Sequence, residues 1–184
     1  TSSDYVLREF GGSLIRKGRV GAEGDPTNGV PSRGADAWLG NGRKPQVLNW
    51  DGSLRRQLEG RVMAKCYHAK LQLAFGFAGD GTGSIFVVEF DLSRSPVGRN
   101  SVPLPLTGTG WDVALLPSGR LLVCVTAATA SSRFEPVLLL SDVSRRSFKK
   151  IGNYFLRGVS LDNRLALIGG IDYASPHWVV RITE

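Results

Sequence analysis

The sequence predicts an all-β chain built from a repeated unit, and three observations indicate this fold class. Short apolar pairs recur along the 184 residues at separations of 41, 40, 51 and 41 positions. Three of these pairs are followed four residues later by an aspartate. One stretch of the chain also reads as four consecutive short strands. The pairs are Val6-Leu7, Val47-Leu48, Val87-Val88, Leu138-Leu139 and Val179-Val180, and the aspartates are Asp51, Asp91 and Asp142. A period of this length in strands and turns is typical of a β-propeller or a related β-repeat array.

The repeat is clearest between residues 108 and 152. Apolar character falls along four successive runs, with a Pro-Ser-Gly turn at residues 117–119 between the first two. Such a series matches one propeller blade, read from the central channel to the rim. The four predicted strands are Trp111 to Leu116, Arg120 to Thr126, Pro136 to Asp142 and Ser147 to Ile151.

Two further copies flank this blade. The hairpin at residues 116–121 recurs at 160–165, with a turn and an arginine in the same places. An earlier copy places strands at 61–67, 70–77 and 84–91, with a fourth, outer strand at 102–106. Residues 47–184 therefore contain clear repeats.

The first 46 residues follow the pattern less closely. Residues 18–46 are rich in Gly and Pro, which indicates either a long recognition loop or a degenerate blade with a mobile tip. Residues 5–10 and 13–17 are predicted to be a third and a fourth strand, and residues 177–182 a third strand at the other end. The segment 13–17 could then complete the last blade and close the ring, which would remove an unpaired sheet edge.

These elements predict a single domain over residues 1–184, with about four blades of four strands each. A larger propeller completed by another chain or a second copy is an equally supported arrangement. An all-β sandwich is the alternative fold.

Composition narrows the function classes. The formal charge of +7 suits an anionic partner, but the charges are spread along the chain without a basic run, so nucleic acid is the third-ranked partner. With Cys66, Cys124, His68 and His177 as the only cysteines and histidines, no metal-ligand spacing occurs, and neither metal nor cofactor is expected.

No apolar run is long enough to span a bilayer, so no membrane contact is expected. The cellular location is open, and Thr1 is compatible with removal of a leader or upstream segment.

The hairpin at residues 111–123, which reads Trp-Asp-Val-Ala-Leu-Leu-Pro-Ser-Gly-Arg-Leu-Leu-Val, resembles the inner strands of TolB-, NHL- and sialidase-like propeller blades. The resemblance extends over residues 46–184 and includes no complete family motif. The Gly-His and Trp-Asp pairs of WD40 blades are absent in register, because Trp111-Asp112 opens a strand instead of closing one. The resemblance implies a propeller fold and a binding face where the strand connections gather around the channel.

Aromatic and charged side chains are predicted to converge on that face, where they would form a ligand-binding surface. For three of these residues a structural interpretation stands beside the functional one: Trp111 fills the core between blades, Asp112 satisfies turn donors, and His177 is a packed or surface residue. The predicted ligand-binding residues are Trp38, Arg61, Asp80, Trp111, Asp112, Arg133, Arg157, Asp172, Tyr173 and His177.

The sequence thus favours a module that binds a protein or a carbohydrate through loops on one face of the ring. The alternative is a propeller-type glycoside hydrolase, for which Asp36 and Asp112 are the candidate carboxylate pair because each precedes an apolar inner-strand run.

Overall fold

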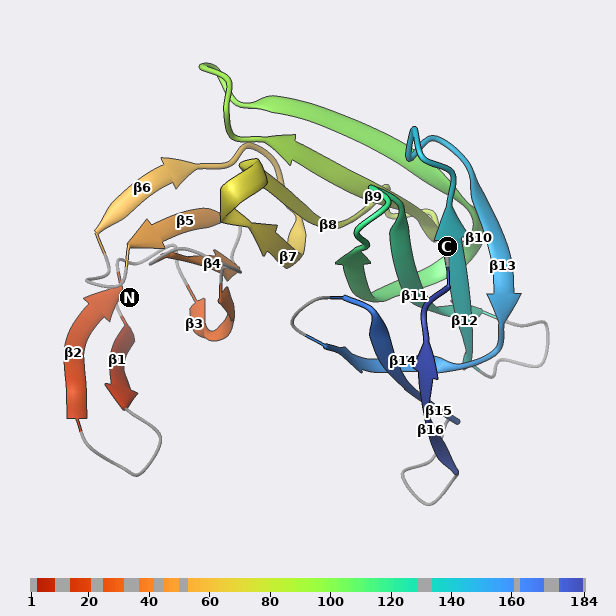
Figure 1. Cartoon of the computed structure of the whole chain (residues 1–184). Coiled ribbons are helices and arrows are strands. Elements are labelled where there is room, and N and C mark those ends of the chain that lie inside the picture. Colours follow the sequence, from red (N-terminus) through yellow and green to blue (C-terminus); the bar gives the residue numbers. More distant parts are fainter. Residues whose placement is uncertain are drawn as a thin grey trace. The chain divides into compact units, whose positions relative to one another are not determined.

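The computed structural model describes residues 3–8, 14–20, 25–31, 37–41, 45–49, 53–128, 134–160, 163–170 and 176–183, and gives side-chain surroundings from residue 45 onward (Figure 1). The chain divides into two compact units. The N-terminal unit contains Thr1–Phe75 and Glu89–Asn100, and the C-terminal unit contains Gly76–Val88 and Ser101–Glu184. Strands β8, β9 and β10 each contribute residues to both units.

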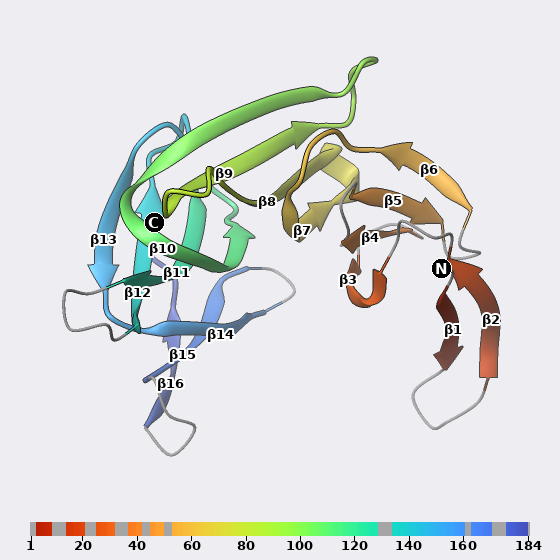
Figure 2. The same ribbon diagram turned by 180° about the vertical axis from the view of Figure 1, so that it is seen from behind.

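The described residues form strands and one short 3₁₀ helix, η1 (Ala69–Leu71). Consecutive strands follow one another in meander order in each sheet (Figures 1 and 2). The strands are β1 (Ser3–Arg8), β2 (Leu14–Val20), β3 (Asp25–Pro31), β4 (Ala37–Asn41), β5 (Gln46–Asn49), β6 (Leu54–Gln57), β7 (Met63–His68), β8 (Leu73–Gly79), β9 (Ser84–Asp91), β10 (Gly98–Leu115), β11 (Leu121–Ala128), β12 (Phe134–Ser141), β13 (Phe148–Gly152), β14 (Phe155–Val159), β15 (Leu165–Gly169) and β16 (His177–Arg181). The predicted all-β class is confirmed.

The N-terminal unit contains the two-stranded sheet β1-β2 and the four-stranded sheet β3-β4-β5-β6. Strands β3 and β4 lie within residues 18–46, the Gly- and Pro-rich stretch. Apolar side chains from β5, β7, β8 and β9 are buried in this unit, among them Val47, Leu48, Tyr67, Phe75 and Phe90.

The C-terminal unit is built around two sheets that pack against each other. Strands β10 to β13 belong to the seven-stranded sheet β13-β12-β11-β10-β9-β8-β7, and β14 to β16 form a three-stranded sheet. Alternate residues of the two sheets point into one shared core, as period-two burial requires. This core contains Ala114, Leu116, Leu122, Cys124 and Leu138 from the first sheet and its turns, and Phe155, Leu156, Ala166 and Ile168 from the second.

Each of the five apolar pairs lies on a strand, and four of them lie on the third strand of a meander. Val47-Leu48 is in β5 of β3-β4-β5-β6, and Leu138-Leu139 is in β12 of β10-β11-β12-β13. Val87-Val88 is in β9 of β7-β8-β9-β10, and Val179-Val180 is in β16 of β14-β15-β16. The remaining pair, Val6-Leu7, is in β1. The repeat in the sequence therefore corresponds to a repeat of strands.

Strand β10 differs from the prediction. Separate strands were expected at 102–106 and 111–116, but the structure has one strand of 18 residues. Gly108 lies where the two expected strands join: its N–H donates to the carbonyl oxygen of Gly83, 3.0 Å away, and it pairs with Ala127 of β11. Its φ is +147°, and a Cβ there would lie 2.0 Å from the carbonyl oxygen of Thr126. Only glycine allows this close approach of β10 to β11, and the strand continues through Gly108 without a turn.

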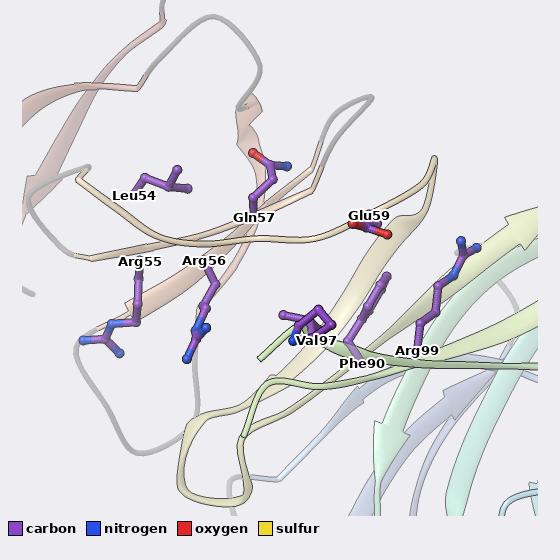
Figure 3. A pocket seen from close by; sticks show the side chains of 9 residues that line it. Leu54, Arg55, Arg56, Gln57, Glu59, Phe90, Val97 and Arg99 are labelled. Atoms are coloured by element: carbon purple, nitrogen blue, oxygen red, sulfur yellow. The ribbon is translucent and has the colours of Figure 1, made fainter. Parts of the chain in front are cut away.

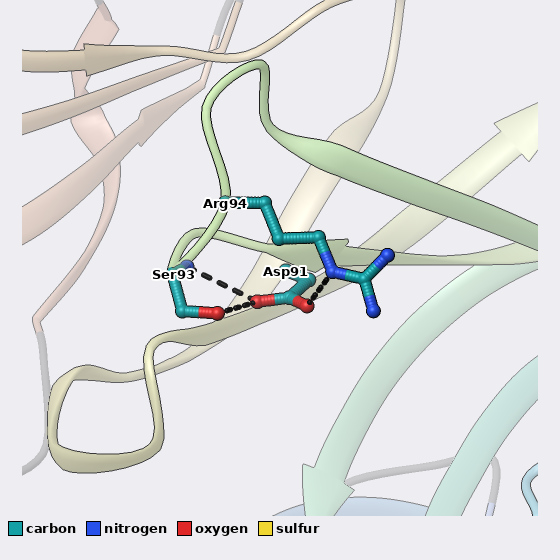
Figure 4. Close-up of polar contacts among 3 residues, drawn as sticks. All are labelled: Asp91, Ser93 and Arg94. Carbon is teal, nitrogen blue, oxygen red and sulfur yellow. Dashed lines mark hydrogen bonds and ion pairs between the residues drawn. The ribbon is translucent and has the colours of Figure 1, made fainter.

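Two of the aspartates that follow the apolar pairs close turns. Asp91 Oδ1 accepts hydrogen bonds from the N–H and hydroxyl of Ser93, and Arg94 Nε lies 2.8 Å from Asp91 Oδ2 (Figure 4). In the corresponding turn, Asp142 accepts from the Ser144 hydroxyl at 2.7 Å and from the Arg146 N–H at 2.8 Å. These bonds, led by that from the Ser144 hydroxyl, lower the pKa of Asp142 to about 2. Asp51 lies outside the described residues.

The described sheets include no closed barrel and no closed ring of blades, so the propeller and the single domain stay predictions. The described part of the segment 13–17, which could close the ring, lies in β2 and pairs with β1 in a two-stranded sheet. No helix of the described residues is long and apolar enough to cross a membrane.

Candidate ligand-binding surface

Two predicted site residues occupy β-bulges, one in β10 of the seven-stranded sheet and one in β14 of the three-stranded sheet. In β10, Gly110 pairs with Val125 and Asp112 with Cys124, so Trp111 is the extra residue. In β14, Leu156 pairs with Ile168 and Gly158 with Leu167, so Arg157 is the extra residue. A bulge changes the direction in which a side chain projects, and bulges are common beside functional sites.

These two side chains meet on the same aromatic ring. The Trp111 and Phe155 ring centroids are 5.0 Å apart at an interplanar angle of 60°, an edge-to-face arrangement. The Arg157 Cζ lies 4.6 Å from the centroid of the Phe155 ring, within the range of a cation–π contact. Phe155 is buried, whereas 44% of Trp111 is exposed. An exposed indole and a half-buried guanidinium therefore contact the same buried ring.

Asp112 lies next to Trp111 and opposite Cys124 in the strand register. Its Oδ1 accepts a hydrogen bond of 2.9 Å from the N–H of Val113. Burial raises the pKa of the Cys124 thiol to about 11, and the negative charge of Asp112 adds to this while Arg157 opposes it. We call Trp111, Asp112, Phe155 and Arg157 the Trp111 surface.

The neighbouring strands extend this arrangement. Arg157 Nη2 donates to the carbonyl oxygen of Gly170, 3.0 Å away, just after β15. His177 pairs with Gly169, and a Cβ on Gly169 would lie 2.4 Å from the imidazole, so the ring covers that glycine. The exposed Trp178 contacts Tyr154 edge-on, with ring centroids 5.8 Å apart.

The remaining predicted residues are placed as follows. Asp80 lies in the turn between β8 and β9, where its Oδ1 accepts from the N–H of Thr82 at 2.8 Å and from its hydroxyl at 2.7 Å. Arg61 is exposed in the N-terminal unit, before β7. The backbone of Trp38 is in β4, and its side chain lies outside the description. Asp36, Arg133, Asp172 and Tyr173 also lie outside the described residues.

The sequence did not single out Phe155 or Tyr154, the rings on which Trp111 and Trp178 rest. The sequence gives little sign of their role, because an aromatic residue at the start of an apolar run is usually interpreted as part of the hydrophobic core. The glycines next to the bulges, Gly110 and Gly158, are the local sign that could have identified the site.

Among the described residues, no group of three or more His, Cys, Asp or Glu side chains could hold a metal ion. The surface offers the indole of Trp111 and the carboxylate of Asp112 from β10, and the guanidinium of Arg157 from β14. Comparison with known proteins found no matching family model, no matching curated protein and no matching solved structure.

Proposed function

We propose that this chain is a binding module of the propeller type, which holds a protein partner on the Trp111 surface. The observation that carries the proposal is the pair of bulges at Trp111, which is exposed, and at Arg157, since both side chains contact Phe155. Tryptophan and arginine are the residues most enriched at interface positions whose truncation costs about 2 kcal/mol or more. A side chain already held in place loses less entropy on binding, which favours affinity.

The propeller part of the proposal is supported by the packing of the C-terminal unit. The sheet β14-β15-β16 packs one face on β10 to β12, as a blade packs on the preceding one. On its other face Leu165, Leu167 and Val179 are exposed, although in a propeller a following blade covers this face. A blade from another chain or a second copy would bury it. The mass of the purified chain in solution, measured by light scattering, tests this assembly.

A carbohydrate is the second candidate ligand. An exposed indole beside the carboxylate of Asp112 and the guanidinium of Arg157 offers an apolar face and directional polar groups, which sugar sites combine. The glycoside hydrolase alternative needs Asp36 as the partner of Asp112, and it stays a prediction.

Trp111→Ala and Arg157→Gln test the proposal, and Phe134→Ala is the matched control, because Phe134 is an exposed aromatic residue of the same unit. Each variant is immobilised, and the proteins captured from an extract of the source cells are quantified. The captured partner is then purified and titrated by calorimetry.

We expect the affinity to fall at least about tenfold for both test variants and to be unchanged for the control. Equal affinity for all three variants would contradict the proposal. If the chain binds a glycan on an array and Trp111→Ala abolishes that binding, the ligand is a carbohydrate and not a protein. Binding that vanishes at moderate salt would instead indicate nucleic acid.

A further inference from the structure

A second site lies in the N-terminal unit, whereas the Trp111 surface belongs to the C-terminal unit. It is a pocket of about 360 Å³, a volume within the range of small-molecule sites. Its apolar lining comes from Phe90 of β9, from Pro96 and Val97 and from Leu54. Its polar lining consists of Arg55, Arg56, Gln57, Glu59 and Arg99 (Figure 3). The pocket thus combines an apolar base with three guanidinium groups and one carboxylate.

A β-bulge gives this pocket two of its arginines. Val47 pairs with Arg56 and Leu48 with Leu54, so Arg55 is the extra residue of β6. Neighbouring side chains of a regular strand point to opposite faces. Figure 3 shows Arg55 and Arg56 on the same side of the strand, as a bulge permits.

The third arginine is held against the backbone of another segment. Gly60 has a φ of +83°, and a Cβ built on it would lie 2.7 Å from Arg99 Nη1. The guanidinium of Arg99 therefore lies against the backbone of Gly60.

The charges of the pocket are only partly balanced. Arg55 Nε donates to Asn49 Oδ1 at 2.8 Å, which orients that side chain. The guanidinium groups of Arg56 and Arg99 make no hydrogen bond or ion pair with the residues that the structure describes. With Glu59 as the one carboxylate among the lining residues, the lining has an excess of positive charge.

We propose that this pocket binds a small organic anion, whose phosphate or carboxylate group is held by Arg56 and Arg99 and whose apolar part lies on Pro96 and Val97. Guanidinium groups present paired donors that match both phosphate and carboxylate oxygens. The exposed Pro96 and the half-buried Val97 supply the apolar contact that inorganic phosphate would not use. This proposal is independent of the proposed function, because the two sites belong to different units.

The test is an NMR titration of the whole chain with phenyl phosphate and benzoate as anionic probes, and with inorganic phosphate and phenol as probes that lack one half of the proposed ligand. We expect phenyl phosphate or benzoate to bind more tightly than inorganic phosphate and phenol. The shifted amide signals should belong to residues 54–59 and 97–99. Tighter binding of phenyl phosphate would indicate a phosphate ligand, and tighter binding of benzoate a carboxylate ligand.

Three variants test whether the binding depends on the residues of the pocket. The double variant Arg56→Gln/Arg99→Gln should weaken binding of the tighter probe at least about tenfold. Glu59→Gln should strengthen it, a gain that loss of folding cannot produce. Arg146→Gln, which removes one exposed charge in the other unit, should leave it unchanged apart from a small effect of net charge.

Three results would overturn the proposal. The first is the absence of shifts at millimolar phenyl phosphate and benzoate. The second is unchanged binding in the double variant, which would place the ligand elsewhere. The third is an equal loss for Arg146→Gln, which would mean that the probes respond to net charge and not to the pocket.

Discussion

The side-chain Nδ2 of Asn163 donates a hydrogen bond to the main-chain carbonyl oxygen of Leu115. Asn163 follows β14 and Leu115 ends β10, so this bond joins the two sheets of the C-terminal unit. The asparagine is buried, and its φ is +57°. Two requirements therefore meet at this position: a donor for a buried carbonyl group and a residue that tolerates the left-handed conformation.

Two substitutions separate these requirements. Asn163→Gly removes the hydrogen bond but keeps the conformational freedom, and should lower the free energy of unfolding by about 1–3 kcal/mol. Asn163→Ala removes both and should cost about 1 kcal/mol more. Urea unfolding measures the difference. An alanine variant at least as stable as the glycine variant would contradict the role of the positive φ, and Asn153→Ala, at an exposed position, should change little.

The shared core of the C-terminal unit gives a second prediction. Leu122 is 3% exposed and belongs to this core, whereas 41% of Leu165 is exposed. Leu122→Ala should lower the free energy of unfolding by about 2–5 kcal/mol, because it leaves a cavity between the sheets. Leu165→Ala deletes the same atoms at an exposed position and should cost less than about 1 kcal/mol. Similar losses in the two variants would show that the two sheets do not pack as described.

Much of the strand pattern could be predicted because its signals are local. Val47-Leu48 and Leu138-Leu139 both lie on buried third strands, and the spacing of such pairs is visible without knowledge of the fold. The turn at Asp142 follows from the ability of an aspartate to accept hydrogen bonds from the backbone N–H groups that follow it.

The parts that could not be predicted depend on register and on contacts between distant segments. Trp111 was selected as a candidate, but its place in a bulge follows from the pairing of β10 with β11, which composition does not reveal. The same holds for Arg55 in β6. Arg99 reaches the pocket from a segment about 40 residues away in the sequence from the other arginines, so no local pattern connects them. Gly108 lies between the two strands expected at 102–106 and 111–116, yet the chain continues through it as one strand.

The buried thiol of Cys124 gives a prediction about pH. Burial, as the largest cause, raises its pKa from 9.0 to about 11 in the folded chain. Below pH 9 the thiol is protonated in both the folded and the unfolded state and contributes no pH dependence. Above pH 9 the unfolded chain loses this proton first, so the unfolded state is favoured as the pH rises towards 11.

The comparison is made in the Cys66→Ser protein, in which Cys124 is the one remaining cysteine. Between pH 9 and 11 its free energy of unfolding should fall by about 2 kcal/mol more than that of the Cys66→Ser/Cys124→Ala protein. Lysines and tyrosines titrate in the same range, but they are common to both proteins and cancel in the comparison. Urea unfolding at several pH values measures both curves. Parallel curves would mean that the Cys124 thiol is accessible to water, which would contradict its burial between Leu138 and Phe155 in the shared core.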